Sequence, residues 1–418
     1  MTITELAKLN KRDLETEVRA TVAELQSALA ALLESLLSLD ASSGELARCL
    51  KLERTLAWKL AKIATEPDAL RAVQYVPGAA GLNIALRSMK RRGASADLAA
   101  AFERAIEKFF AIVDQYAEDR ASFDMMVSAC ADEGQASIET VHRRAAFKGN
   151  SFTLGVQART QFKAIFEQPA EDPTKLDIAS LRGLVSFSRI RPNISWITAR
   201  LRSSSEDGGA PTHERSRRQS LANLGDISGS PCSPLIPRFC SKPPPELVTE
   251  PGPYGFLDEK LVAGPLGKVG AVTCVSGDVW RSVVPRYADE GSRISRLLTH
   301  AYTPCEAIII DKFVHEDAWG ALEPECQVFS EIMSGPLYGI STYEPQRLDI
   351  AASVEYLGKG SAVIRTPHIP GYPDMARYVF DKLGWNGSRF DVYRILIPFP
   401  PIPATIAMRH EIPRCPVK

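Results

Sequence analysis

The sequence predicts a multidomain α+β protein, in which an all-helical N-terminal half is followed by a C-terminal domain of mixed strands and helices. Three observations predict this fold class. The length of 418 residues allows about two or three domains of roughly 150 residues each. Up to about residue 130, apolar residues recur at helical spacing. Beyond residue 254, short apolar runs alternate with turn-forming residues, which indicates strands.

The charge balance and the cysteines restrict the possible classes of function. The chain has 50 Lys and Arg against 50 Asp and Glu, so any contact with nucleic acid needs a local basic face. Its eight Cys include no C-x-x-C pair and its N-terminus is charged, so we expect reduced thiols in a cytoplasmic protein. The most apolar stretch, residues 25–39, is too short to span a bilayer, and we expect no membrane partner.

Residues 1–40 are predicted to form one long amphipathic helix. Its apolar side chains recur with alternating spacings of four and three, which is the pattern of a heptad seam. The seam consists of Leu14, Val18, Val22, Leu25, Leu29, Leu32, Leu36 and Leu39. Such a seam either forms a coiled coil with a second copy, giving a homodimer, or packs on the protein's own helices, and the sequence leaves both open.

Residues 41–150 are predicted to form a helical domain. Small and turn-forming residues at 40–44 end the first helix, and a second helical pattern begins at once. A Pro-Gly turn then precedes a predicted helix over residues 82–89. Residues 95–130 carry apolar side chains on one face, with Ser95 as the expected N-cap.

The segment over residues 43–63 has the composition of two short helices that cross at a turn. Such helices need a small residue where they touch, here Ala47, and apolar residues beside the turn, such as Leu50. The segment resembles the helix-turn-helix of bacterial transcription regulators. In that alignment Ala57 stands where a larger β-branched residue is usual, and Lys51 stands where the turn often has Gly. Because a left-handed Lys costs roughly 1 kcal/mol, we expect this turn to be built differently.

The resemblance implies a second helix that begins near residue 54 and enters the major groove of double-stranded DNA. Its outward-facing, DNA-binding residues are expected to be Arg54, Thr55, Trp58, Lys59 and Lys62. These side chains suit phosphates and base edges. Between residues 43 and 92, ten Lys and Arg stand against four Asp and Glu, as a phosphate-facing surface requires. The alternative is a helical hairpin inside a larger bundle, with Trp58 in the core and the lysines at a solvated rim.

The remainder of the chain is predicted to comprise three parts. Residues 151–202 are a connecting segment, residues 203–253 are a flexible linker rich in Ser and Pro, and residues 254–418 form an α+β domain. In that domain we expect strands at 271–275, 307–310, 362–365, 392–397 and 404–408, with a helix at 374–384.

The sequence offers few candidates for catalysis or metal binding. The six His show no spacing that places two ligands on one metal ion, so we expect no metal site, no cofactor and no catalytic residue. One polar cluster suggests an enzyme as an alternative, with His315 as a general base oriented by Glu316 or by Asp317, of which Asp317 is better placed. Cys274 or Cys305 would then be the nucleophile. We expect instead that this cluster forms a surface turn.

The function predicted from these features is sequence-specific, DNA-binding transcriptional regulation in the cytoplasm. The long N-terminal helix would help to form a homodimer, and the C-terminal domain would bind an unknown effector or a partner. A second basic stretch, at residues 142–148, would extend the nucleic-acid surface or bind an anion. Two alternatives remain open, an enzyme with its active site near His315 and a self-assembling structural protein.

Overall fold

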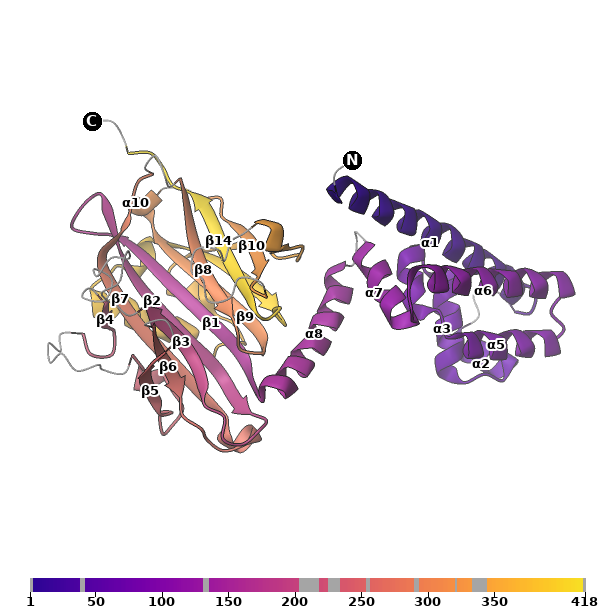
Figure 1. Ribbon diagram of the computed structural model, residues 1–418, viewed down its shortest axis with the longest axis horizontal. Coiled ribbons are helices and arrows are strands. Elements are labelled where there is room, and N and C mark those ends of the chain that lie inside the picture. The colour runs from indigo at the N-terminus through magenta and orange to yellow at the C-terminus, as the bar shows by residue number, and fades with distance from the viewer. Residues whose placement is uncertain are drawn as a thin grey trace. The chain divides into compact units, whose positions relative to one another are not determined.

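The chain forms two compact units in the computed structural model, one covering Met1–Glu139 and the other Thr140–Lys418. The first unit is helical and the second is built mainly of strands (Figure 1). The predicted α+β fold class is therefore confirmed. The structure describes residues 3–37, 42–130, 135–202, 218–224, 234–252, 256–288, 293–319, 322–332 and 344–415.

The first unit consists of helices joined by short turns. They are α1 (Ile3–Glu34), α2 (Ser43–Leu50), α3 (Arg54–Thr65), α4 (Ala69–Ala72), α5 (Ala79–Arg91), α6 (Ala96–Tyr116) and α7 (Arg120–Cys130), with a 3-10 turn at Val73–Tyr75 after α4. The helical block predicted over 95–130 is thus two helices, because extended backbone at Ala117 ends α6. Ser95 occupies the N-cap position of α6, but its side chain makes no capping hydrogen bond, contrary to the prediction.

The apolar seam of α1 is buried in the core of the first unit. Val22, Leu25 and Leu29 are each 0% exposed, and α1 packs along α6 with further contacts to α3, α4 and α7. The seam therefore packs on the protein's own helices, which is one of the two alternatives that the sequence left open. Because those side chains are already covered, this fold does not offer them to the predicted coiled-coil homodimer. Leu39 lies outside the described residues.

The second unit is built from strands, which follow helix α8 (Gln135–Leu154). The strands are β1 (Val156–Pro169), β2 (Lys175–Arg189), β3 (Trp196–Arg202), β4 (Arg218–Ser220), β5 (Leu247–Pro251), β6 (Phe256–Leu261), β7 (Val272–Pro285), β8 (Ile294–Ala301), β9 (Cys305–His315), β10 (Glu325–Ser330), β11 (Arg347–Leu348), β12 (Glu355–Lys359), β13 (Phe390–Pro398) and β14 (Ala404–Glu411). Helix α10 (Glu316–Trp319) follows β9, and α11 (Tyr372–Leu383) precedes β13.

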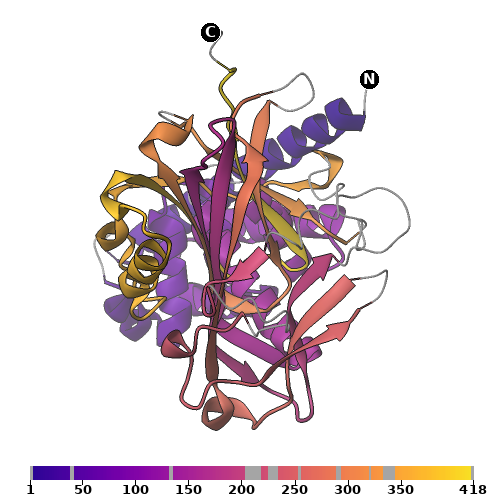
Figure 2. The same cartoon turned by 90° about the vertical axis from the view of Figure 1, so that its left-hand side faces the viewer.

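These strands form three sheets (Figure 2). The largest has the order β12-β13-β9-β1-β2-β7-β4, and in it β1 runs parallel to β9. A second sheet has the order β11-β10-β14-β8, and the third has the order β3-β6-β5. Apolar residues of β9, β13 and β14, such as Ile308, Ile395 and Ile406, form one core between the two larger sheets. Helix α11 covers the opposite face of the largest sheet, where Phe380 meets Phe166.

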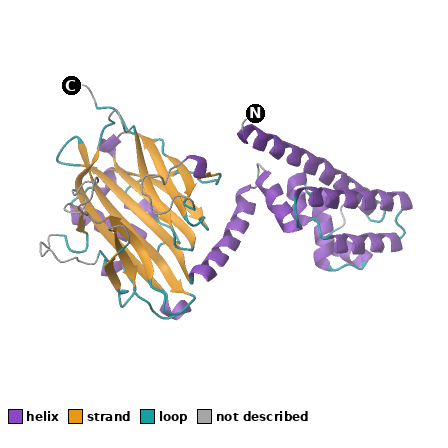
Figure 3. Cartoon of the chain, in the orientation of Figure 1, coloured by secondary structure: helices purple, strands orange, loops and turns teal. Residues whose placement is uncertain are grey.

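Strands occupy much of the predicted connector and parts of the predicted linker that the structure describes (Figure 3). Residues 203–217, 225–233 and 253 of the predicted linker lie outside the described residues. Residues 151–202 contain β1, β2 and β3, and the described parts of 203–253 contain β4 and β5. Strand β2 and the C-terminal part of β1 are largely buried on both faces, whereas burial alternates over the first nine residues of β1. Strand β4 is fastened to β7 by an ion pair between Arg218 and Asp278 at 2.9 Å. The boundary between the two units in the sequence therefore lies after residue 139, not within residues 203–253.

The predictions for the C-terminal part are confirmed except at one position. Strands predicted at 271–275, 307–310, 392–397 and 404–408 overlap β7, β9, β13 and β14, and the helix predicted at 374–384 corresponds to α11. Residues 362–365 do not form a strand, because the chain makes a 3-10 turn at Ser361–Ile364 that buries Ile364 in the core with α11.

None of the helices in the described part of the chain is both long enough and apolar enough to cross a bilayer.

Candidate nucleic-acid interface

Helix α2 begins with a capping box and ends in a tight turn that leads to α3. The Ser42 hydroxyl accepts a hydrogen bond from the N–H of Glu45, whose carboxylate in turn accepts one from the N–H of Ser42 at 2.8 Å. At the other end, the N–H of Leu52 donates to the carbonyl of Ala47 at 3.0 Å, as in a Schellman motif. The connection between the helices comprises only residues 51–53, so the turn fixes how they cross.

Lys51 adopts the left-handed conformation in this turn, with φ 50° and ψ 44°. The prediction that the turn is built differently is therefore wrong, since Lys51 takes the conformation that Gly adopts most easily. Two hydrogen bonds from α5 hold the turn in place. The Ser88 hydroxyl donates to the carbonyl of Leu50, and Nε of Arg92 donates to the carbonyl of Cys49 at 2.7 Å. These bonds offset the backbone strain of roughly 1 kcal/mol.

The inner face of α3 is anchored to the core of the first unit. Ala57, Leu60 and Ile63 are each 0% exposed, so Ala57 packs in the core despite its small size. At the C-terminal end of α3, Nε2 of Gln26 in α1 donates to the carbonyls of Ile63 and Glu66 at 2.9 and 2.8 Å. These bonds satisfy carbonyls that a helix end otherwise leaves unpaired. The helix is therefore held along its length and presents a fixed outer face.

The outer face of α3 carries the residues that were predicted to bind DNA. Four of them are exposed, namely Arg54, Thr55, Trp58 and Lys62, and Lys59 is partly exposed. Trp58 is 43% exposed and meets Tyr75 edge-on, with 5.6 Å between the ring centroids. The predicted pair of helices over residues 43–63 is present, and Trp58 is not the core residue of the alternative interpretation.

The charge on this face is positive and is not neutralised by the chain. Helix α3 contains no Asp or Glu, and within the described part of the chain neither Lys59 nor Lys62 forms an ion pair. Lysines elsewhere in the unit do pair: Lys90 lies 2.9 Å from Glu103, and Lys108 lies 2.7 Å from a carboxylate in α1. The ammonium groups of α3 thus remain available to an external anion.

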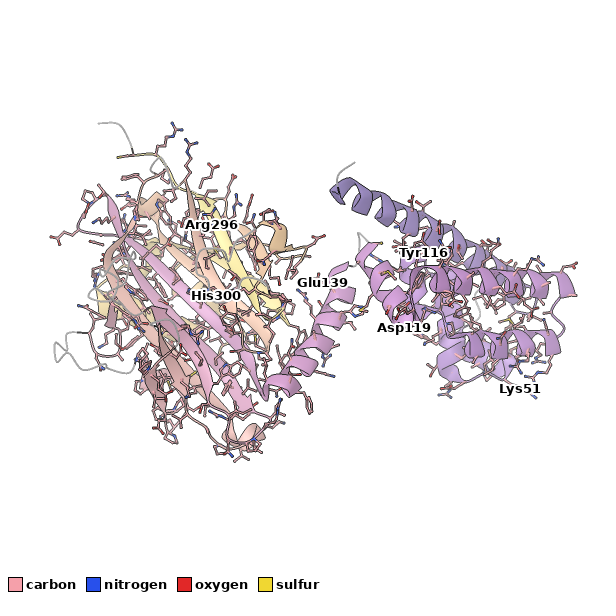
Figure 4. The ribbon with its side chains drawn as sticks, viewed as in Figure 1. Lys51, Tyr116, Asp119, Glu139, Arg296 and His300 are labelled. Carbon is pink, nitrogen blue, oxygen red and sulfur yellow. The ribbon has the colours of Figure 1, made fainter. Side chains whose placement is uncertain are left out.

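Further basic residues, which the sequence did not place at the site, lie around the same turn. Arg48 and Lys51 are exposed at the end of α2, and Arg91 is exposed at the end of α5. Figure 4 shows Lys51 at this end of the first unit. The bond from Arg92 to the carbonyl of Cys49 brings the end of α5 against the turn. The charge of this run was visible in the sequence, but its position depends on packing between helices that are about 40 residues apart.

The structure does not assemble the alternative catalytic site around His315. Its Nδ1 lies 3.8 Å from Oδ2 of Asp317, which is too far for a hydrogen bond, and accepts one from the N–H of Asp317 instead. Burial raises the pKa of Cys274 and Cys305 to about 12, so neither thiol ionises near neutral pH. The surface turn predicted here is wrong for His315, which is 4% exposed because it ends the central strand β9. Glu316 and Asp317 are exposed, as predicted.

A different histidine belongs to a polar cluster on the sheet β11-β10-β14-β8. Nδ1 of His300 in β8, which Figure 4 labels, lies 2.6 Å from Oε1 of Glu331. The ring of His300 stacks on that of Tyr302. The hydroxyls of Tyr302 and Thr405 also donate to the carboxylate of Glu331. Burial raises the pKa of Glu331, but the hydrogen bonds from the other three residues outweigh it and lower the pKa overall. The hydrogen bonds of the cluster join residues 29 to 105 positions apart, so no short sequence spacing could have revealed it.

Comparisons with known proteins add no relative: no family model matches the chain, and no match was found among curated proteins or solved structures. Among the described residues, no group of three His, Cys, Asp or Glu is placed to hold a metal ion. Support for an interface on α3 therefore comes from the geometry and charge of this chain.

Proposed function

We propose that the first unit binds double-stranded DNA through α2 and α3, and that the chain is a sequence-specific transcriptional regulator. The observation that carries the proposal is the outer face of α3, which combines basic, hydroxyl and aromatic side chains and lacks any acidic residue. In this proposal the second unit binds an effector or a partner.

The dimensions of α3 suit the major groove. A helix with its side chains is about 10–12 Å across, and the groove of B-DNA is about 12 Å wide. Arg54 and Thr55 stand in the first turn of α3, where recognition helices contact base edges. Lys59 and Lys62 follow one and two turns later, at positions suited to the phosphates that wall the groove. Trp58 lies between these groups and can pack on a sugar or on a thymine methyl group.

In this proposal, Arg54 contributes sequence specificity, and Lys59 and Lys62 contribute affinity. A guanidinium group at Arg54 can pair with a guanine edge, which gives about 1–3 kcal/mol of discrimination between bases. The lysines contact phosphates, which give affinity without sequence preference. Substitutions at the two kinds of position should therefore differ in their effect on specificity.

The test is the salt dependence of binding to a labelled DNA duplex, measured by fluorescence anisotropy with the full chain. We expect Lys59→Ala and Lys62→Ala each to weaken binding and to reduce the slope of log affinity against log salt by about 0.9. Arg54→Ala should weaken binding and relax the preference for one base pair.

Lys108→Ala is the matched control, since Lys108 lies in α6 of the same unit and is already paired with Glu24. The control should bind DNA as the unsubstituted chain does. If the slopes of the Lys59 and Lys62 variants equal that of the control, these residues touch no phosphate and the proposal fails.

A further inference from the structure

One end of the second unit is formed by segments that contain no acidic residue. Residues 140–166, 178–202 and 260–277 together hold twelve Lys and Arg and no Asp or Glu. Three of these cations are paired with acidic residues outside the segments: Arg182 with Glu259 and Asp278, Arg200 with Asp258, and Lys260 with Glu250. The segments meet where α8 and β2 end and where β1 and β7 begin (Figure 1). We call this region the acid-free end.

Contacts between the segments make the acid-free end a single surface. The guanidinium of Arg191, just after β2, donates to the carbonyl of Phe152 in α8 at 2.6 Å and lies 5.8 Å from the centre of its ring. The backbone of Arg189 pairs with that of Leu266, in the turn that leads to β7. Three stretches that are far apart in the sequence are therefore held side by side.

Apolar side chains project from this surface into solvent. Val269 is 95% exposed, Phe152 72% and Leu266 47%. Val269 and Leu266 belong to one Pro- and Gly-rich turn, in which Lys268 is also exposed. Single exposed apolar residues are ordinary, but several of them beside exposed basic side chains mark an interaction surface.

We propose that the acid-free end binds the anionic surface of a lipid bilayer. The aliphatic tips of Leu266 and Val269 would enter the boundary between headgroups and acyl chains, while Lys268 and Arg191 stay at the headgroup phosphates. Nucleic acid suits this surface less well, because aliphatic side chains at a turn neither stack on bases nor pair with phosphates. The contact is peripheral. This proposal differs from the expectation of no membrane partner, which was based on the absence of a predicted membrane-spanning segment.

The acidic residues that border the acid-free end lie outside its projecting turn, and Glu246 and Glu306 are two of them. The carbonyl of Glu246 accepts a hydrogen bond from Val262 at 3.1 Å, and that of Glu306 accepts one from Phe399 at 2.9 Å. The projecting turn itself, residues 265–270, carries exposed Leu266, Lys268 and Val269 and no acidic side chain.

The test is flotation of the full chain with vesicles of phosphatidylcholine containing phosphatidylglycerol, compared with vesicles of phosphatidylcholine alone. We expect binding to the anionic vesicles only, weakened by added salt. Val269→Asp should reduce vesicle affinity about tenfold or more, and Lys268→Gln about fivefold. The controls are Ile332→Asp, at a position that is 75% exposed elsewhere in the unit, and Lys382→Gln, at an exposed position in α11. Both controls should bind as the unsubstituted chain does.

Three results would overturn the proposal. The first is no binding to anionic vesicles at low salt, or equal binding by Val269→Asp and its control. The second is that Val269→Asp weakens binding of a DNA duplex and leaves vesicle binding unchanged, which would assign the surface to nucleic acid. The third is a dimer in sedimentation velocity that Val269→Asp dissociates, which would assign the surface to a second copy. Because the DNA proposal concerns residues of α3, either proposal can fail without the other.

Discussion

The two units differ in whether they bury charged side chains: the second unit buries several, and the first buries none among its described residues. Among the described side chains of the first unit, Ser88 is the only buried polar one. The second unit buries ion pairs within its largest sheet: Asp311 lies 2.7 Å from Arg394, and Lys312 lies 3.1 Å from Glu167. Each of these pairs joins adjacent strands. Removing an ion from water costs several kcal/mol unless a partner of opposite charge is close, so the second unit depends on its pairs.

Because of this difference, charged residues have different roles in the two units. In the first unit the charges lie at the surface, and those of α3 remain available to a ligand. In the second unit Arg182 contacts both Glu259 and Asp278, so each buried charge in this group is neutralised within the sheets. A buried group of charged residues, as in the sheets of the second unit, is therefore a structural support, whereas exposed basic residues that form no ion pair among the described residues, as on α3, are available to a ligand.

The largest effect expected from this comparison is the loss of a buried ion pair. Asp311→Asn leaves the guanidinium of Arg394 buried without a counter-charge, and we expect it to destabilise the second unit by about 3–5 kcal/mol. The first unit should unfold as before, which calorimetry of the full chain can show. Asp374→Asn is the control, because the pair of Asp374 with Arg377 is exposed and should contribute little. Equal effects of the two substitutions would contradict the comparison.

The second prediction concerns pH. Burial, together with the nearby ammonium of Lys312, lowers the pKa of His410 from 6.5 to about 4. Between these values the unfolded chain binds more protons than the folded one, so the second unit loses stability as the pH falls from 6.5 to 4. The loss amounts to at most about 3 kcal/mol.

The first unit has no His and should show no such histidine-linked loss. Thermal unfolding across this pH range measures both units. His410→Asn should flatten the dependence of the second unit, whereas His368→Asn should leave it in place. If His410→Asn leaves the slope unchanged, His410 is not the group responsible.

The smallest effect is expected at Lys51, in the first unit. Lys51→Gly removes left-handed strain, and we expect it to stabilise the first unit by about 1 kcal/mol or less. Lys62→Gly, within α3, should have the opposite sign and a cost of about 1 kcal/mol. Helix unfolding followed by circular dichroism would compare the two. Destabilisation by Lys51→Gly would show that the lysine side chain, and not the backbone, supports the turn.

The same contrast explains how much could be predicted from the sequence. In the first unit, apolar spacing predicted the long helices, because the hydrophobic pattern and the packing coincide there, and the resemblance to a helix-turn-helix predicted the exposed face of α3. In the second unit, β1 and β2 were missed although burial alternates over the first nine residues of β1, because both strands carry charged residues, such as Lys163, Glu167 and Arg182, within the sheet. The partners of Arg182 are 77 and 96 residues away, so the sequence cannot show that its charge is neutralised. The turn at Lys51 could not be predicted either, since it depends on hydrogen bonds from α5.

The position of α1 in the first unit bears on how the chain folds as it is synthesised. Helix α1 leaves the ribosome before α6, yet its apolar seam is covered chiefly by α6, which begins only at Ala96. At roughly 5–20 residues per second, the seam stays open for several seconds before its cover is made. During that interval the nascent chain exposes a leucine-rich stripe of the kind that chaperones bind, so α1 is the segment most prone to aggregation during translation.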